Sequence, residues 1–309
     1  MKKQKSNCAK ARPFLKWAGG KTQLLPEFTK RLPNEINAGS ITKFIEPFIG
    51  GGAFFFYITR NFSFDKCYIC DINEELVLSY KTVQQAVQEL AEELEIFEAE
   101  FLSSNDHQKE EYYYDVRDAF NKDLPAIDFS KYGPEWIRRT AQIIFLNHTC
   151  YNGLFRVNRR GEFNVPFGRY KNPEILNKEN LCMVSQILNN TRIVTGDFTK
   201  TRRYADEDTF VYLDPPYRPL NTTSSFTSYS KSGFSDLDQK RLAKFFRDLD
   251  ARGAKVMLSN SDPRNHDPED AFFDDLYSGY TIERIPAKRM INCNGSLRGK
   301  VSELVITNY

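Results

Sequence analysis

The sequence predicts an α/β protein whose core is a mixed, mainly parallel β-sheet with helices on both faces. Strand-like segments alternate with helical patterns at both ends of the chain, and residues 79–173 interrupt this alternation. The interrupting stretch is first helical and then hairpin-like, which is typical of an inserted domain. We therefore expect one domain over residues 1–78 and 174–309 and an inserted domain over residues 79–173.

Two strand–turn–helix passages open the predicted sheet. Residues 41–57 run from a strand through a triple-glycine turn into an apolar helix, and residues 67–76 contain a second short strand. A long helical stretch follows, because apolar residues recur at steps of three and four from Leu76 to Phe97. Further helical patterns cover residues 110–122 and 134–148.

Residues 150–170 have a different pattern, which favours a loop or a β-hairpin. The turn signals Asn152-Gly153 and Arg160-Gly161 separate short extended pieces. Strand–helix alternation returns after this segment. An amphipathic helix is predicted over 237–253, and strands are predicted over 191–198, 209–217, 254–261, 280–286 and 302–309.

The composition is that of an ordinary globular protein. Of the 309 residues, 40% are hydrophobic and 27% are charged, which argues against disorder and fibres. No run of about 18 apolar residues predicts a membrane span, and no apolar segment follows the basic start, so we expect a cytoplasmic protein. Cys67 and Cys70 lack a second Cys/His pair, and the three histidines are far apart in sequence, so no metal site is expected.

Charge is distributed unevenly, although the formal net charge is only +2. Residues 89–123 contain twelve acidic and three basic side chains, whereas residues 136–171 contain seven basic side chains and one acidic. Aromatic residues are interleaved with the basic ones in the second window, a pattern suited to a phosphate backbone and base stacking. A solvated basic face is the alternative.

A glycine-rich turn predicts a cofactor site. It comprises Glu46, Pro47, Phe48, Ile49, Gly50, Gly51 and Gly52, where a strand turns into a helix. Glycines there allow close approach of a ligand and leave helix-start N–H groups pointing at it, although many tight turns need glycine for other reasons. Asp71 ends the next strand, where a carboxylate accepts hydrogen bonds from ribose hydroxyls. NAD and S-adenosylmethionine both fit, and capping of the following helix is the alternative role for Asp71.

The segment Asp214-Pro215-Pro216-Tyr217 follows an apolar strand and therefore lies at a carboxyl sheet edge, where ligands bind. The two prolines prevent a helix from continuing here and leave a backbone carbonyl free to accept a hydrogen bond from a ligand. The Asp214 carboxylate and this carbonyl are suited to accept both hydrogens of an amino group, aiming its lone pair at a methyl carbon. Tyr217 is placed to stack on the attached ring. A proline-rich turn without chemistry is the alternative.

These motifs, and the order in which they follow one another along the chain, resemble those of amino-directed DNA methyltransferases that use S-adenosylmethionine. The similarity is greatest to the Dam branch, including its restriction–modification members of the DpnII and MboI type. It covers the chain from Pro13 to Tyr309 and implies a Rossmann-like methyltransferase sheet with an inserted target-recognition domain. The matching segments are PFLKWAGGK (13–21), EPFIGGGAFFF (46–56), DINEEL (71–76), YNGLFRVNRRGEFNVPFGRYKNP (151–173), DPPY (214–217), FTSYSKSGF (226–234) and RGKVSELVITNY (298–309).

The resemblance implies roles for individual residues at the cofactor and at the target base. Asp214, Pro215, Pro216 and Tyr217 match the segment that holds the flipped adenine. The S-adenosylmethionine contacts implied by the resemblance are Trp17, Lys21, Asp71 and Asp214, with Asp197 and Phe198 bordering the adenine of the cofactor.

The resemblance also implies DNA contacts. Lys16 matches the residue that touches the first guanine of GATC, and Arg156 matches the reader of the second half of the site. Roles for Asn147 to Cys150 stay open. Three residues match those that the family inserts between stacked bases: Tyr151, Asn152 and Leu154. Pro166 and Arg169 match positions that lie near a base and near the DNA backbone.

The predicted function is therefore methylation of the exocyclic amino group of adenine in double-stranded DNA, after the base leaves the duplex. A cognate restriction endonuclease acting on the same site is compatible with this prediction, without a stable complex, and so is a solitary enzyme. A Rossmann oxidoreductase would explain the glycine turn and Asp71 but leave DPPY and the basic window unexplained. A DNA-binding protein that no longer methylates would explain only the basic window.

Overall fold

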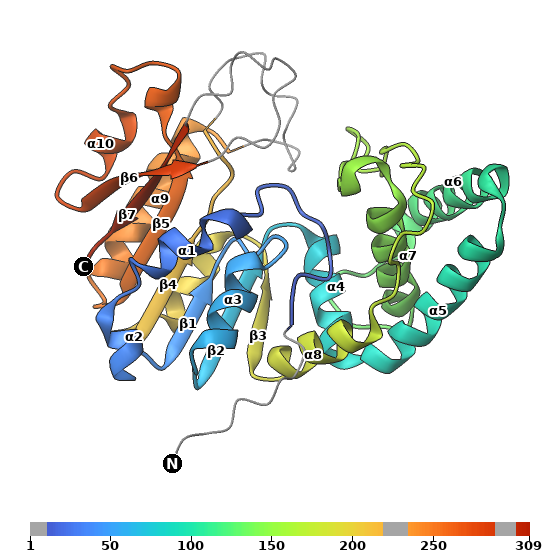
Figure 1. Cartoon of the computed structure of the whole chain (residues 1–309). Helices are drawn as coiled ribbons and strands as arrows, with labels where there is room; N and C mark the ends of the chain where they lie inside the picture. The colour runs from blue at the N-terminus through green and yellow to red at the C-terminus, as the bar shows by residue number, and fades with distance from the viewer. Residues whose placement is uncertain (1–10, 219–233, 288–300) are drawn as a thin grey trace. The chain divides into compact units, whose positions relative to one another are not determined.

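The computed structural model describes residues 11–218, 234–287 and 301–309 (Figure 1). These residues divide into two compact units, which we call the sheet unit and the helical unit. These units are defined by how compactly their residues pack. The boundaries that we expect between a catalytic and a DNA-recognition domain, at 78/79 and 173/174, stay a prediction. The sheet unit comprises the described residues of Lys21–Ile49, Phe62–Asn73 and Arg192–Tyr309, and the helical unit comprises those of Met1–Gly20, Gly50–Asn61 and Glu74–Thr191.

A seven-stranded sheet forms the core of the sheet unit, in the order β3-β2-β1-β4-β5-β7-β6 (Figure 1). Strand β1 is parallel to β2 and β4, and β4 is parallel to β5, whereas β7 is antiparallel to β5 and β6. The predicted mixed, mainly parallel sheet is confirmed. The strands are β1 (Lys43–Glu46), β2 (Lys66–Asp71), β3 (Thr191–Thr195), β4 (Thr209–Leu213), β5 (Lys255–Ser261), β6 (Thr281–Ala287) and β7 (Val301–Thr307).

The strand order explains where a ligand would bind. Strand β1 is the first in sequence and has β2 on one side and β4 on the other, so the direction of chain progression reverses between β1 and β4. In open α/β sheets, ligands bind at the carboxyl ends of the strands beside such a reversal. All five residues of β4 are buried, which accounts for its unbroken apolar sequence.

Helix α9 (Asp236–Asp250) is the longest helix of the sheet unit's described residues. Its start is set by a capping box between Ser235 and Asp238, and its apolar residues join those of β4 and β5 in one core. The shorter helical segments are η1 (Thr22–Leu24), α1 (Leu25–Thr29), α2 (Asn34–Ala38), η4 (Phe198–Tyr204), η6 (Pro263–Asn265) and α10 (Phe272–Leu276).

The helical unit contains the helices expected before residue 150, with one difference. The long stretch predicted after Leu76 is divided at Ala86, whose φ of −142° leaves the helical region. Hydrogen bonds from the Ala86 N–H to Thr82 and from the Leu90 N–H to Ala86 continue across the break, so the apolar period does not reveal it. The helices are α3 (Ala53–Asn61), α4 (Glu74–Gln85), α5 (Val87–Ser103), α6 (Asp106–Asp123), η2 (Leu124–Ala126), α7 (Glu135–Thr149), η3 (Tyr151–Gly153) and α8 (Lys178–Leu188).

Residues 150–170 fold back on themselves, as the loop-or-hairpin prediction requires. Two isolated antiparallel bridges join Cys150 to Phe167 and Val157 to Phe163. Residues 226–233 and 298–300 of the matching segments lie outside the described residues. No helix in the described part of the chain is long and apolar enough to cross a membrane.

Candidate active site

An ammonium group, two carboxylates and three hydroxyls lie together near the carboxyl ends of β4 and β5. Asp214 follows β4, and its Oδ1 lies 2.8 Å from the Nζ of Lys21. The same Nζ donates to the Ser259 Oγ at 2.9 Å and lies 3.7 Å from Glu303 Oε2. The Ser259 hydroxyl contacts Asp214 at 3.3 Å and the Tyr212 hydroxyl at 2.8 Å. We call Lys21, Asp214, Tyr217, Ser259 and Glu303 the edge cluster.

Lys21 keeps its charge although its side chain is only 6% exposed. Burial lowers the pKa of Lys21, but the negative charges of Asp214 and Glu303 and the hydrogen bond with Asp214 outweigh it and raise this pKa above its ordinary value. For Asp214, burial raises the pKa above its ordinary value, and the Lys21 ammonium and the Ser259 hydroxyl oppose that rise only in part. The ammonium thus favours the ionised form of a buried carboxyl group at a sheet edge.

Tyr217 is oriented by a residue far away in the sequence. Its hydroxyl donates to the Glu303 carboxylate, at 2.8 Å from Oε1 and 3.0 Å from Oε2. Burial and the neighbouring carboxylates raise the pKa of Tyr217, so the hydroxyl stays a donor. The Lys21 Nζ lies 4.8 Å from the ring centroid, within cation–π range, and the Tyr217 residue is 41% exposed. The ring is therefore held in place while part of it stays accessible.

The turn after β4 is anchored on both sides of Tyr217. The buried Gln239 side chain donates to the Pro216 carbonyl at 3.2 Å. Arg218 pairs with Asp236 and Asp270, each at 2.7 Å. These contacts preorganise the backbone that carries the predicted amine acceptors.

Sequence reasoning missed Ser259, Glu303 and Gln239. Ser259 directly follows the apolar run 256–258 of β5, and Glu303 directly precedes the apolar run 304–306 of β7; a polar residue at the end of such a run was the available signal. Glu303 in β7 lies opposite Ser261 of β5, so only the strand order brings it to this edge.

Asp71 ends β2 and has a local structural partner. Its Oδ1 accepts the Asn73 N–H at 2.9 Å, and its carbonyl accepts the Gly196 N–H at 2.8 Å. The first bond is a side-chain turn just before α4, close to the capping role considered as the alternative. A carboxylate has acceptor sites for more than one donor, so this bond is compatible with ribose binding.

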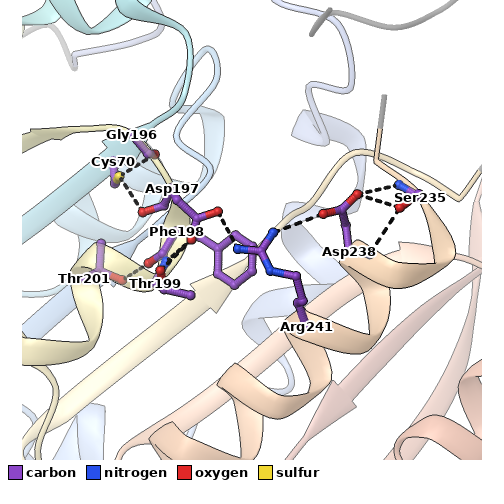
Figure 2. A network of polar contacts seen from close by, with 9 residues as sticks. All are labelled: Cys70, Gly196, Asp197, Phe198, Thr199, Thr201, Ser235, Asp238 and Arg241. Carbon is purple, nitrogen blue, oxygen red and sulfur yellow. Dashed lines mark hydrogen bonds and ion pairs between the residues drawn. The ribbon is translucent and has the colours of Figure 1, made fainter. Parts of the chain in front are cut away.

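Asp197 lies at the centre of the polar network in Figure 2. Its Oδ1 accepts the Thr199 N–H at 3.0 Å, and its Oδ2 lies 2.9 Å from Arg241 of α9. Burial raises the pKa of Asp197, but the bonds from Thr199 and Arg241 outweigh it and lower this pKa below its usual value. Arg241 also lies 5.3 Å from the Phe198 ring centroid, and Phe198 is buried in the core. Contact of Asp197 and Phe198 with a cofactor stays a prediction.

In the helical unit, Trp17 lies against the glycine turn. A Cβ added to Gly50 would lie 3.1 Å from Trp17 Cδ1, and one added to Gly51 would lie 3.1 Å from Trp17 Cβ. Gly52 has a φ of +74°, and a Cβ there would lie 2.7 Å from the Tyr80 hydroxyl. The glycines are therefore required for packing within this unit, whatever they contribute to a ligand.

All predicted DNA contacts belong to the helical unit. Tyr151 is 56% exposed. The Arg156 Nε donates to Asn164 Oδ1 at 2.8 Å, which orients an exposed guanidinium. Arg169 has a φ of +55° and a long, exposed ion pair of 3.5 Å with Glu110. The remaining predicted contacts are Lys16, Asn152, Leu154 and Pro166, of which Lys16, Asn152 and Pro166 are exposed and Leu154 is half-buried.

Comparisons with known proteins identify the family of this chain. A family profile described as D12 class N6 adenine-specific DNA methyltransferase matches residues 17–291. The Type II methyltransferase M.MjaIII of Methanocaldococcus jannaschii is 54% identical, over 96% of this chain and 99% of that protein. The DNA adenine methylase of Haemophilus influenzae is 33% identical, over 96% and 93% of the two chains. A profile match of this extent and relatives aligned over nearly their whole lengths show that the chain belongs to the D12 class of N6 adenine-specific DNA methyltransferases.

Proposed function

We propose that this enzyme transfers a methyl group from S-adenosylmethionine to the exocyclic amino group of adenine in the sequence GATC, after flipping the base out of duplex DNA. The ion pair between Lys21 and Asp214 is the observation that carries the proposal. It places a carboxylate acceptor, paired with an ammonium group, directly before the Pro-Pro-Tyr turn. An amino group is oriented by acceptors for its hydrogens. Because the amine itself attacks the methyl carbon, the reaction needs no nucleophile from the protein.

The chain's own groups orient the amine. The Asp214 carboxylate accepts one amino hydrogen and the Pro215 carbonyl accepts the other, which directs the nitrogen lone pair away from the ring plane. Tyr217, held by Glu303, stacks on the adenine. S-adenosylmethionine supplies the electrophilic methyl carbon. Preorganised acceptors of this kind lower the barrier because they need no rearrangement during the reaction.

The residues at the strand ends suit this cofactor. The half-buried Asp71 carboxylate presents an acceptor at the end of β2, next to the reversal of strand order, and ribose hydroxyls are donors. Glu46 and Pro47, at the end of β1, are proposed to border the same ligand. In the helical unit, Trp17, Gly50, Gly51 and Gly52 are proposed to contribute further cofactor contacts.

Replacing Asp71 by Ala is expected to weaken S-adenosylmethionine binding by about 1–3 kcal/mol, because hydrogen bonds to a charged acceptor are lost. Calorimetry with the cofactor measures this loss, and duplex DNA binding without cofactor serves as the internal control. The variant also loses the bond from the Asn73 N–H, so its melting temperature is measured in parallel. A lower melting temperature with unchanged cofactor affinity would assign Asp71 to the turn alone.

Sequence choice is proposed to depend on the helical unit. An arginine that donates two hydrogen bonds to a base edge discriminates by about 1–3 kcal/mol. We expect Arg156→Ala to relax the second half of the GATC site, while Arg169→Ala weakens binding to all sequences alike and reduces its salt dependence. The proposed DNA contacts are Lys16, Tyr151, Asn152, Leu154, Arg156, Pro166 and Arg169.

Plasmid from an expressing, methylation-deficient host gives the direct test of GATC. A GATC endonuclease that adenine methylation blocks should fail to cut this plasmid. Complete cutting, with methyl groups found in other sequences, would refute GATC while leaving the reaction itself intact.

The identity to a protein named Type II methyltransferase supports pairing with a restriction endonuclease, and the similarity to DNA adenine methylases supports a solitary role. The gene adjacent to this one distinguishes the two roles.

A further inference from the structure

Asn147, near the end of α7, holds the main chain of two separate segments. Its Oδ1 accepts the Lys16 N–H at 2.7 Å, and its Nδ2 donates to the Lys16 carbonyl at 2.9 Å. The same Nδ2 donates to the Gly153 carbonyl at 3.0 Å. Asn147 is 1% exposed. A buried amide that uses one acceptor and two donors in this way fixes both segments at once, since each broken bond would leave a buried polar group unsatisfied.

The two segments also meet through side chains. A Cβ on Gly153 would lie 2.3 Å from Lys16 Cδ, so the stem of Lys16 passes directly over the Gly153 turn. The Lys16 Nζ lies 5.4 Å from the Tyr170 ring centroid, and the Tyr170 hydroxyl accepts the Asn152 N–H at 3.2 Å. Lys16, the Gly153 turn and Tyr170 therefore form one continuous surface of the helical unit.

Neighbouring residues of the same helix end add to this arrangement. The two ring nitrogens of His148 lie within hydrogen-bond distance of the Phe14 and Glu174 carbonyls. Thr149 accepts the Gly168 N–H through its carbonyl at 2.9 Å. The last turn of α7 thus supports the segments around residues 14–16, 151–156 and 166–174 from a single helix.

We infer that Asn147 is a positioning residue for sequence recognition, which holds Lys16 and the turn at 151–156 as one reading surface. The inference rests on the proposed function, in which these segments contact bases. Hydrogen bonds to base edges discriminate only when their donors are held within a fraction of an ångström. Loss of the Asn147 amide should therefore impair discrimination at both halves of the site, while the edge cluster stays intact.

The chain offers a matched control in Asn180 of α8. Its Oδ1 accepts the Arg12 N–H at 2.9 Å and its Nδ2 donates to the Arg12 carbonyl at 3.0 Å, and it is 4% exposed. Asn180 therefore holds the main chain of Arg12 as Asn147 holds that of Lys16, but the hydrogen bonds of its side chain and its N–H are with Arg12 and Asn177, neither of which is a proposed DNA contact. Replacing either asparagine by Asp removes the amide donors and changes the volume little.

The experiment compares Asn147→Asp with Asn180→Asp on the sequence that the wild-type enzyme is first shown to methylate. The measured quantity is the ratio of kcat/KM on that site to kcat/KM on sites with one base changed. We expect Asn147→Asp to lower this ratio roughly tenfold or more, with unchanged S-adenosylmethionine binding. Asn180→Asp should leave the ratio within roughly twofold of wild type, even if its melting temperature falls equally. Unchanged discrimination in Asn147→Asp, or equal loss in both variants, would overturn the inference.

A second variant keeps the test decisive if Asn147→Asp does not fold. Gly153→Ala places a methyl group against the Lys16 stem and should lower the same ratio. Gly39→Ala is its control, because Gly39 has a φ of +76° and no atom within 4 Å of the added Cβ. An unchanged ratio in Gly153→Ala contradicts the inference. A wild-type site other than GATC would refute only the GATC proposal, since discrimination is measured on the site actually found.

Discussion

Asp214→Ala is expected to lower the single-turnover rate of methyl transfer by roughly a hundredfold or more, which corresponds to about 3 kcal/mol of activation free energy. The variant removes the carboxylate that is proposed to accept one amino hydrogen, so that only the Pro215 carbonyl would remain to orient the amine. Binding of duplex DNA should persist, because all the proposed DNA contacts belong to the helical unit. Rapid-quench measurement of methylated product and a separate DNA-binding titration check the two statements.

A control is needed because Asp214 also pairs with the buried Lys21. Asp248→Ala removes a half-buried carboxylate of the same unit, whose partner Arg202 is exposed, and it should leave the rate unchanged. Denaturant unfolding of both variants separates loss of folded enzyme from loss of chemistry. A single-turnover rate near wild type in folded Asp214→Ala enzyme would refute the assignment of Asp214 as the amine acceptor.

Arg139→Ala should destabilise the helical unit by about 3–5 kcal/mol, the usual cost of removing one partner of a buried ion pair. The Arg139 side chain is 1% exposed and pairs with Glu75 of α4. It also donates to the Phe120 carbonyl of α6, and its guanidinium lies 3.3 Å from the centroid of the Phe120 ring. One side chain of α7 thereby joins three helices. Denaturant-induced unfolding followed by circular dichroism measures the loss.

The neighbouring Arg138 is the control for Arg139. Its ion pair with Glu93 spans 3.4 Å and its side chain is 66% exposed, so Arg138→Ala should cost less than about 1 kcal/mol.

The cost of Arg139→Ala should also depend on pH. Burial already raises the pKa of Glu75, opposed by Arg139, and removing Arg139 should raise this pKa further. A carboxyl whose folded-state pKa lies above its unfolded value destabilises the fold at higher pH. The defect of Arg139→Ala should therefore shrink as pH falls through the folded-state pKa of Glu75, and equal costs for both variants would contradict this account.

Local sequence patterns were sufficient to predict the strands and most helices. Apolar runs and turn residues along the chain predicted β1, β2, β4 and β5. The pattern is clearest in β4, because all five of its residues are buried. The division at Ala86 was not predictable in this way, since its backbone hydrogen bonds continue the helical pattern on both sides. In contrast, the position of Asp214 at a carboxyl sheet edge was predictable, because Asp214 directly follows an apolar strand.

The partners of these residues were decided by the tertiary structure. Tyr217 and Glu303 are 86 residues apart in sequence, and Lys16 and Asn147 are 131 residues apart. No periodicity links such positions, because strand order and helix packing bring them together. The amino-acid sequence by itself thus determined which residue types stand at the strand ends and turns. Only the folded chain determined which polar groups satisfy one another, because a buried donor or acceptor takes the partner that the surrounding fold places within reach.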